Sequence, residues 1–380
     1  MPTLPSVDVI VLTYNHRHFI KQALDSVLMQ SGEFKLRVTI IDDFSTDGTR
    51  EVVQQYARSR PDVIRLRLHD SNLNSGRPLM EEILRSKADY VAILEGDDYW
   101  LRPDKLQKQI HYLHVHRDCA ICYHNVYVIY EDGRRLTHLK NPENQPLRSC
   151  IHDLFVRDFI ATCSVIYRRT ALDSIPDWYA EVEGGDWNLH LLAAQSGFIG
   201  YIREPLGVYR VHSAGVWSSM SAVQQWQYSA DVLCEMFSHF DATFHRDIQN
   251  GLVNVYQYLA HAQAAAGDLI GSLESLRKAR INDRSQWPSS PTIVDMLPSK
   301  LILGAGQAGE ALELSIQCKT ALPTSFVVFN GTPLKTEFKS PSLLCGYVPF
   351  SLLKCAGSYP VHVIDLTGES NPIRFQIFER

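Results

Sequence analysis

Long apolar segments are missing from this sequence of 380 residues. No run approaches the ~18 apolar residues that a membrane-spanning helix requires, and the N-terminus lacks the basic and then apolar pattern of a secretion signal. The expected location is therefore the cytoplasm. An excess of positive charge is also missing, because the formal net charge is −5, so we expect no nucleic-acid partner.

Cysteine patterns typical of structural zinc are absent as well. The eight cysteines are scattered, and Cys119 with Cys122 forms the only C-x-x-C pair. A structural zinc site would need a second such pair. The surrounding stretch has the pattern of a strand, so we expect these cysteines to be buried, reduced thiols.

What the sequence does contain is a regular alternation over residues 7–98. The runs VDVIVLT, LRVTIID, VIRLRLH and YVAIL are predicted strands, and the segments between them carry apolar residues at helical spacing. Strands that alternate with helices predict an α/β fold with a parallel, doubly wound sheet.

The rest of the chain predicts further regions, because 380 residues exceed one ordinary domain. Residues 220–283 have a helical pattern only and include one helical hairpin that resembles a tetratricopeptide unit. SQWPSSPTIVDMLPS is rich in proline and serine and predicts a linker. The expected divisions are 1–217 for the first domain, 218–285 for the helical region, 286–299 for the linker and 300–380 for a small α/β module.

Polar side chains follow all four predicted strands. Ligands bind at the carboxyl ends of strands in an open parallel sheet. Carboxylates gathered there repel one another unless a cation is present, and their hard oxygens suit Mg²⁺ or Mn²⁺. The absence of a Walker sequence argues against a P-loop phosphate site. An ion with only a few protein ligands stays open to phosphate oxygens, so the predicted chemistry is departure of a metal-held diphosphate. The strand-end residues are Thr13, Tyr14 and Asn15; Asp42 and Asp43; the NLNSG stretch; and Glu95, Gly96, Asp97 and Asp98.

Three ordered motifs carry a specific resemblance. VDVIVLTYNHRHFIKQALDSVLMQ, VTIIDDFSTDGT and LEGDDYW together resemble the N-terminal half of a family 2 glycosyltransferase with the GT-A fold, a Rossmann-like mixed sheet, over residues 6–217. The resemblance implies that Asp43 binds the base of a nucleotide and that Thr13 and Tyr14 border its pocket. The residues assigned to the donor nucleotide are Thr13, Tyr14, Asn15, Asp42, Asp43, Arg77, Glu95, Gly96, Asp97 and Arg210.

The same resemblance assigns metal ligands. Glu95-Gly96-Asp97 occupies the D-x-D position, where Asp97 is the expected ligand and the longer Glu95 is suited to ribose hydroxyls. Asp98 either shares the metal or caps the following turn. In related enzymes a histidine placed like His212 completes the metal shell, the alternative being an ordinary core or surface histidine. Arg210 is expected to pair with donor phosphates.

The motif EGGDW lies where the family carries its general base. Asp186 directly precedes an apolar helical pattern, whereas Glu183 is separated from it by two glycines. We therefore assign the base to Asp186, which is also suited to cap that helix.

These assignments predict an inverting, metal-dependent glycosyltransferase that moves a sugar from a nucleotide sugar, UDP by default, to a hydroxyl of a glycan or lipid-linked acceptor in bacterial surface polysaccharide synthesis. A lipid-linked acceptor would bring the protein to the inner face of the membrane. The regions after residue 217 are candidates for oligomerisation. The alternatives are a sugar nucleotidyltransferase, which normally has a glycine-rich basic loop where this chain has TYNHRH, and an inactive nucleotide-sugar-binding module.

A second glycine motif lies near the C-terminus. Gly304, Gly306 and Gly309 have G-x-G-x-x-G spacing after an apolar run and before a predicted helix, which is typical of a Rossmann-like module. The next predicted strand ends in Asn330, where a dinucleotide site would carry an acidic residue. We therefore favour a degenerate module in which the glycines serve packing, with nucleotide binding as the alternative.

Overall fold

The computed structural model describes residues 4–133, 136–182, 185–282, 291–302, 311–321, 325–365 and 368–378. The chain forms two compact units, Met1–Ser219 and Met220–Arg380, and each is described by itself.

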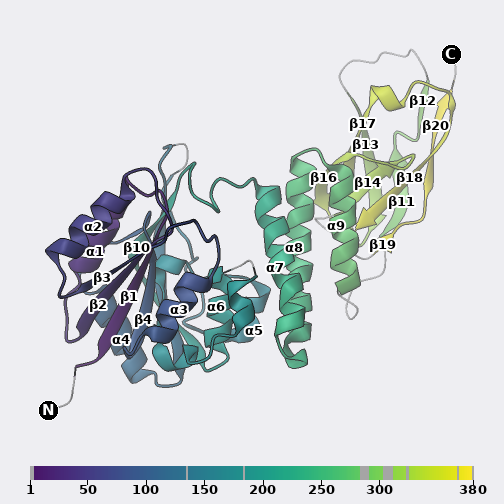
Figure 1. Ribbon diagram of the computed structural model, residues 1–380. Coiled ribbons are helices and arrows are strands. Elements are labelled where there is room, and N and C mark those ends of the chain that lie inside the picture. The colour runs from purple at the N-terminus through teal and green to yellow at the C-terminus, as the bar shows by residue number, and fades with distance from the viewer. Residues whose placement is uncertain are drawn as a thin grey trace. The chain divides into compact units, whose positions relative to one another are not determined.

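The first unit opens with parallel βα units, as the strand–helix alternation predicts (Figure 1). Strand β1 pairs in parallel with β2 on one side and with β4 on the other, and β2 pairs in parallel with β3. The carboxyl ends of these four strands therefore meet at one edge. The elements are β1 (Ser6–Thr13), α1 (Ile20–Leu28), β2 (Lys35–Asp42), α2 (Thr49–Ser59), β3 (Ile64–Leu68), α3 (Arg77–Arg85) and β4 (Tyr90–Glu95).

The second half of this unit turns the sheet into a mixed one. Its strand order is β3-β2-β1-β4-β9-β6-β10-β5, and β9 is antiparallel to both β4 and β6. This confirms the mixed α/β sheet expected for the first domain. The elements are β5 (Tyr99–Trp100), α4 (Lys105–Val115), β6 (Cys119–Tyr130), β7 (His138–Leu139), β8 (Arg148–Ser149), α5 (Ile151–Val156), β9 (Ile166–Arg168), α6 (Gly185–Ala194) and β10 (Phe198–Val211), with 3-10 turns at Thr162–Ser164, Arg169–Leu172 and Asp177–Ala180.

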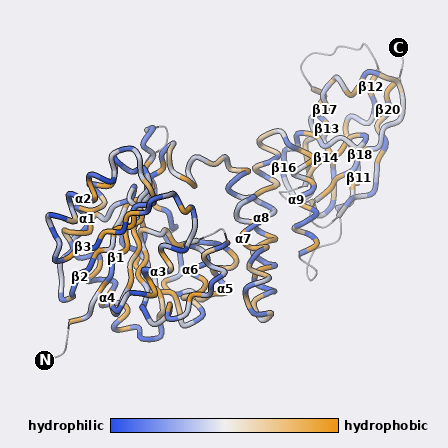
Figure 2. Tube along the Cα trace, viewed as in Figure 1, coloured by the Kyte–Doolittle hydropathy of each residue, from blue (hydrophilic) through white to orange (hydrophobic). Residues whose placement is uncertain are grey.

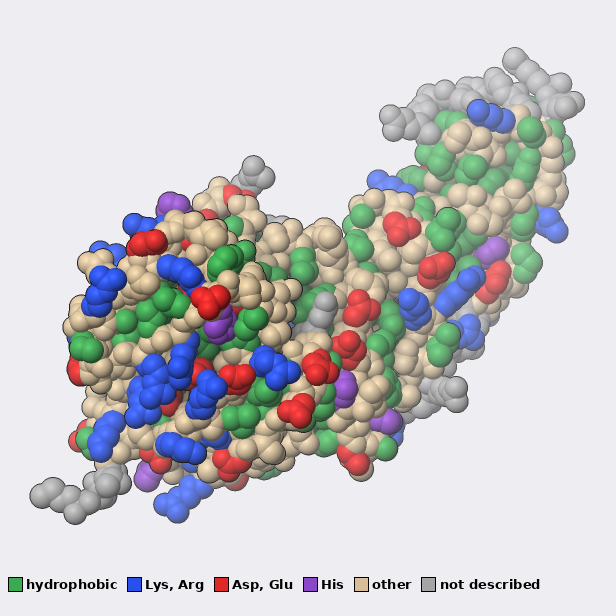
Figure 3. All heavy atoms as spheres, viewed as in Figure 1, with side chains coloured by type: hydrophobic (Ala, Val, Ile, Leu, Met, Phe, Trp, Pro, Cys, Tyr) green, Lys and Arg blue, Asp and Glu red, His purple; other side chains and the backbone are tan. Residues whose placement is uncertain are grey.

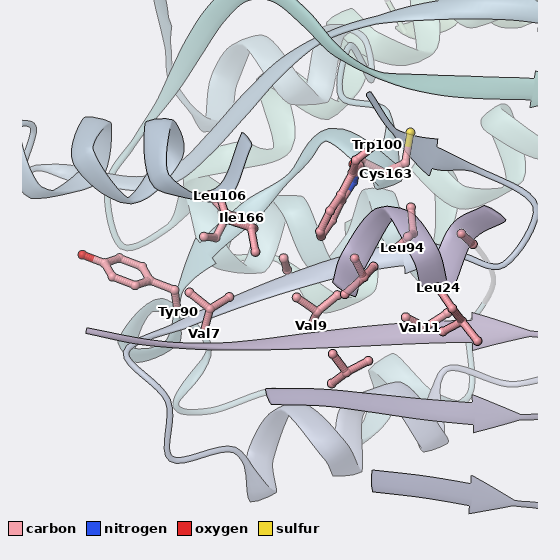
Figure 4. Packing of buried hydrophobic residues seen from close by; sticks show 14 of the residues in the cluster. Val7, Val9, Val11, Leu24, Tyr90, Leu94, Trp100, Leu106, Cys163 and Ile166 are labelled. Carbon is pink, nitrogen blue, oxygen red and sulfur yellow. The ribbon is translucent and has the colours of Figure 1, made fainter. Parts of the chain in front are cut away.

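The core of the first unit lies on the central strands. Val7, Val9 and Val11 alternate along β1 and are completely buried, and Leu24 of α1 belongs to the same cluster (Figure 4). Hydrophobic residues concentrate along these strands (Figure 2). Burial of this apolar surface fixes the central strands, and the polar loops are thereby held at their ends.

The second unit begins with three helices. They are α7 (Ala222–His239), α8 (His245–Ala265) and α9 (Leu269–Asn282), with a 3-10 turn at Ala242–Phe244. Helices α8 and α9 form the expected helical hairpin, and Gly267 in the left-handed region (φ 86°) stands in the turn between them. No helix among the described residues is both long and apolar enough to cross a bilayer.

The described part of residues 300–380 corrects the expected Rossmann-like module. It contains strands and one 3-10 turn but no α-helix, and the segment expected to be the helix after the glycine motif forms strand β13 (Ala311–Lys319). Its apolar residues alternate, because Leu314, Ile316 and Cys318 are buried while Glu313 and Gln317 are exposed. Period-two alternation fits a half-buried strand and not a helix. Gly304, Gly306 and Gly309 lie outside the described residues.

Two sheets make up this region. One has the order β11-β13-β17-β16, and the other β12-β20-β18-β14-β15, with β19 paired to β18. Strand β11 lies within residues 286–299, which were expected to be a linker. The elements are β11 (Thr292–Leu297), β12 (Lys300–Ile302), β14 (Phe326–Phe329), β15 (Thr332–Pro333), β16 (Lys335–Ser340), β17 (Leu343–Pro349), a 3-10 turn (Phe350–Leu352), β18 (Gly357–Asp365), β19 (Gly368–Glu369) and β20 (Ile373–Phe378).

Charged side chains of both signs lie close together on the surface. Figure 3 shows lysine and arginine side chains interspersed with aspartate and glutamate on the face in view. Several arginines are paired, for example Arg67 with Glu82 at 3.0 Å and Arg60 with Asp62 at 3.2 Å. Such pairing reduces the positive electrostatic potential that these arginines create at the surface.

Candidate active site

The loop after β4 approaches the end of β1 closely. The backbone N–H of Gly96 donates to the carbonyl of Leu12 at 2.7 Å. A Cβ at residue 96 would lie 2.8 Å from His16 Nδ1 and 2.9 Å from Thr13 Oγ1. Only glycine fits at this position without displacing those side chains, so Gly96 brings the acidic loop against the Thr13–His16 turn.

Asp97 faces two histidines. Its Oδ2 lies 3.0 Å from Nε2 of His212, which directly follows β10, and 3.6 Å from Nε2 of His16. Burial alone would favour the neutral acid, but His212 and His16 outweigh it and hold the pKa of Asp97 below its ordinary value. The structure thus brings Asp97 and His212 together and adds His16, which the sequence analysis did not name.

Glu95 and Asp98 complete an acidic cluster with Asp97. One carboxylate oxygen from each of the three lies within 4.8 Å of the others. Burial first, and then the charges of Asp97 and Asp98, raise the pKa of Glu95 well above its ordinary value. No lysine or arginine among the described residues forms an ion pair with Glu95 or Asp97. A divalent cation would relieve this repulsion, and the carboxylate and imidazole donors suit Mg²⁺ or Mn²⁺.

Asp98 also has a structural contact. Its side chain is buried, and its Oδ1 accepts the backbone N–H of Arg210 at 2.8 Å. This bond ties the acidic loop to β10, the strand that carries His212 at its end. This contact is a positioning role that differs from both predicted roles of Asp98, a metal ligand or a cap of the following turn.

Arg210 is surrounded by protein groups. Its Nε lies 3.1 Å from Oε1 of Glu131, and its guanidinium donates to the carbonyl of Asp97 and to Gln22. It also lies over the rings of Phe19 and Tyr99. These contacts orient Arg210 beside the acidic loop.

The predicted nucleoside residues gather at the ends of β1 and β2. Asp43 Oδ1 lies 3.0 Å from His69 Nδ1 and accepts the N–H of Leu73 at 3.0 Å. The Asp43 N–H donates to the Thr13 carbonyl at 3.0 Å, so Thr13 stands between Asp43 and Gly96. The residues predicted to bind the nucleoside and the metal are therefore adjacent, at the same edge of the sheet.

The other predicted donor residues differ in exposure. Asp42 is completely buried and accepts from Arg50 Nε at 2.7 Å, which indicates a structural role. Asn15 has φ 56° and its Oδ1 accepts the Thr46 N–H, which shapes the turn. Tyr14 is exposed, and Arg77 is an exposed residue at the start of α3.

A second polar cluster surrounds Asp186, in the first turn of α6. Asp186 Oδ2 accepts the hydroxyl of Thr162 at 2.6 Å, and Oδ1 accepts the Trp187 N–H at 2.9 Å. Asp158 and His190 each place a ligand atom within 4.8 Å of Asp186. Glu183 lies outside the described residues. Because Asp186 contributes to the electrostatic environment of Glu95, the two clusters are neighbours.

Sequence reasoning missed four residues of these clusters: His16, Asp158, Thr162 and His190. His16 directly follows the Thr-Tyr-Asn turn, so its position carried a signal. Helical spacing also carried a signal for His190, which lies four residues after Asp186 on the same helix, α6. Asp158 and Thr162 lie in stretches without a motif, and only the folding of the chain brings them to Asp186.

Comparison with known proteins places the chain in a family. The model of Glycosyl transferase family 2 matches residues 8–175. The putative teichuronic acid biosynthesis glycosyltransferase TuaG of Bacillus subtilis (strain 168) is 32% identical over 224 residues, covering 57% of this chain and 82% of TuaG. An uncharacterized protein of Mycobacterium tuberculosis (strain ATCC 25618 / H37Rv) is 38% identical over 218 residues, and the match spans 56% of this chain but only 61% of that relative.

A solved structure shares the fold. The mannosyltransferase PcManGT from Pyrobaculum calidifontis, in complex with GDP-Man and Mn²⁺, matches with a TM-score of 0.51 and 17% identity, covering 76% of this chain and 78% of PcManGT. Both the family model and the match to TuaG, which covers most of that relative, indicate a glycosyltransferase. The chain therefore belongs to glycosyl transferase family 2.

Proposed function

We propose that this protein is an inverting, metal-dependent glycosyltransferase, which transfers a sugar from a nucleoside-diphosphate sugar to an acceptor hydroxyl. The observation that carries the proposal is the position of Asp97 between His212 and His16 at the sheet edge that also holds Asp43. A donor that spans this edge would place its base at Asp43 and its diphosphate at Asp97.

Each part of the donor has a matching group on the protein. The carboxylate of Asp43 accepts hydrogen bonds, which suits the N–H groups of a base. Asp97 and His212 would hold Mg²⁺ or Mn²⁺, with Glu95 beside them. The bound cation would offset the negative charge that develops on the departing diphosphate.

Asp186 is suited to receive the acceptor's proton. As the acceptor oxygen forms its bond to the anomeric carbon, its proton passes to a carboxylate oxygen of Asp186. The bond between the anomeric carbon and the phosphate oxygen breaks, and its electron pair leaves with the diphosphate. A single displacement of this kind inverts the anomeric configuration. The Thr162 hydroxyl fixes the orientation of Asp186 by its 2.6 Å bond to Oδ2.

The acceptor class proposed is a glycan or lipid-linked glycan of a bacterial surface polysaccharide. TuaG, which matches over most of its length, is described as a putative teichuronic acid biosynthesis glycosyltransferase. With a lipid-linked acceptor, the protein would act in the cytoplasm at the inner face of the membrane.

Thermal stability and nucleotide release test the proposal. UDP or GDP with Mn²⁺ is expected to raise the melting temperature, and a panel of UDP- and GDP-sugars is expected to yield one donor from which nucleotide is released. GDP-sugars are included because PcManGT, which shares the fold, binds GDP-Man. If neither nucleotide stabilises the protein with Mn²⁺, the donor site is wrong.

Two isosteric variants separate binding from chemistry. Asp97→Asn is expected to lose both the Mn²⁺-dependent stabilisation and activity. Asp186→Asn should retain that stabilisation and lose about 10²–10⁴-fold in kcat, the usual contribution of a general base. Normal turnover by Asp186→Asn would exclude Asp186 as the base.

A further inference from the structure

Asp158 and Asp186 form a carboxylate pair, and the proposed chemistry assigns a role to Asp186 only. Carboxylate oxygens of the two residues lie within 4.8 Å of one another, although 28 positions separate the residues in the chain. Asp158 follows α5, and its Oδ1 accepts the N–H of Ile160 at 3.1 Å, which fixes the side chain in a turn. Asp186 is fixed by Thr162. Both carboxyl groups are therefore held in place.

The nearby histidine does not neutralise this pair. His190 is completely buried, its Nδ1 lies 2.6 Å from the hydroxyl of Tyr167, and its Nε2 has no hydrogen-bond partner. Burial lowers the pKa of His190 to about 4, so its imidazole is neutral at physiological pH. Two carboxylates this close, without a cation between them, cannot both ionise easily.

Other titratable groups surround Asp158 and Asp186 at greater distances. Lys140 and Arg157 supply positive charge and favour ionisation of Asp158, and the charge of Asp186 in turn disfavours ionisation of Glu95. The neighbouring phenols stay protonated, because burial raises their pKa values; they are Tyr123, Tyr167, Tyr179 and Tyr209.

We propose that Asp158 is a positioning residue for Asp186: the two carboxyl groups share one proton in the resting protein, and an ionised Asp158 increases the proton affinity of Asp186. This rests on the proposed function, in which Asp186 removes the acceptor's proton. Burial, and then the charge of Asp186, raise the pKa of Asp158 to about 7, so Asp158 is neutral below pH 7 and negative above it.

Proton transfer differs between the two states of the pair. Below pH 7 the acceptor proton moves to Asp186 beside a neutral Asp158, and both carboxyls are then protonated. Above pH 7 the same proton moves to Asp186 beside a negative Asp158, which stabilises the protonated form. The stronger base then gives faster transfer, by about three- to tenfold for typical Brønsted behaviour. In both cases the proton leaves to solvent after product release.

Carbon-13 NMR of protein labelled at the aspartate carboxyls tests the pair without catalysis. In metal-free full-length protein, one carboxyl is expected to titrate near pH 7 and to disappear in Asp158→Asn. In Asp186→Asn that titration should move to lower pH, because the neighbouring charge is gone. A wild-type spectrum without a carboxyl that titrates near pH 7 would overturn the proposal. So would a titration that Mg²⁺ removes in the Asp97→Asn variant, because the pair would then be a cation site.

The pH profile of nucleotide release tests the consequence. Asp158→Asn, which retains the acceptor for the Ile160 N–H, is expected to match the wild-type kcat below pH 6 and to be about three- to tenfold slower above pH 8. Asp158→Glu should restore part of the difference. A merely structural role would lower kcat equally at every pH, and parallel profiles would contradict the inference. If the wild-type protein transfers no sugar at all, the proposed function fails, while the NMR titration still decides whether the carboxyls share a proton.

Discussion

At the scale of single residues, the proposed chemistry depends on a few side chains whose partners fix their orientation. Asp97 has two histidine neighbours, Asp98 holds the backbone of β10, and Asp186 accepts from Thr162. A carboxylate that is already held by a hydrogen bond loses little freedom when substrate arrives. Orientation of this kind can be tested without altering the carboxylates themselves.

Thr162→Val removes the hydroxyl that donates to Asp186 and preserves the shape of the side chain. A hydrogen bond to a charged group contributes about 1.5–3 kcal/mol, and 1.36 kcal/mol of barrier is tenfold in rate, so kcat is expected to fall by roughly 10- to 100-fold. The donor KM should stay unchanged, because the Thr162 hydroxyl bonds to Asp186, the proposed base, which is not among the residues proposed to hold the donor. Steady-state nucleotide release measures both values.

The control for this variant is Thr292→Val, at an exposed position of β11 in the second unit. It makes the same chemical change at a residue outside the first unit. Wild-type kcat in Thr162→Val would show that the 2.6 Å bond does not orient the base.

The sequence predicted the residues that lie in ordered motifs and missed those that do not. Asp43, Asp97 and His212 were found because strand ends and family motifs mark their positions. Asp158 was not, because it approaches Asp186 only through tertiary packing, which no local pattern records. His190 stands four positions after Asp186 on α6, so helical spacing could have found it. The strand-end pattern also marked Asp42, which is completely buried and accepts a hydrogen bond from Arg50.

At the scale of elements, periodicity decided which predictions were right. The buried runs of β1, β2 and β4 gave a correct parallel sheet, since each is bounded by turn residues, and an amphipathic helix follows both β1 and β2. The prediction of a C-terminal helix, which rested on the glycine spacing, is wrong, because the alternating apolar residues of ALELSIQCK form a strand. A glycine motif indicates a dinucleotide site only when a helix follows it.

Paired substitutions in β13 test this correction. Leu314 and Ile316 are both completely buried, so replacing either with alanine is expected to lower the free energy of unfolding by about 2–5 kcal/mol. Gln317→Ala, at an exposed neighbouring position, should change it by less than about 0.5 kcal/mol. Urea unfolding followed by circular dichroism measures the change. On a helix, Leu314 and Ile316 would lie on opposite sides, so a large cost at only one of them would contradict the strand.

At the scale of the whole molecule, the proposed reaction is confined to the first unit. Every predicted donor, metal and base residue lies between Thr13 and His212, and the first unit ends at Ser219. The turn that follows β10 is also closed within this unit, because the Ser218 hydroxyl donates to the His212 carbonyl at 2.7 Å and the Gly215 N–H donates to the same carbonyl at 3.1 Å. The position of His212 thus depends on residues before the boundary.

Residues 1–219 produced alone are therefore expected to bind the donor nucleotide as the full chain does. The apolar core of the central strands is complete in this fragment, so it should fold and be stabilised by UDP or GDP with Mn²⁺ to the same extent, within about twofold in Kd, which corresponds to about 0.4 kcal/mol. Isothermal titration gives the Kd, and Asp97→Asn in the same fragment is the matched control. A fragment that has native circular dichroism but no nucleotide affinity would mean that the second unit completes the donor site, and the assignment of binding to the strand ends of the first unit would then be insufficient.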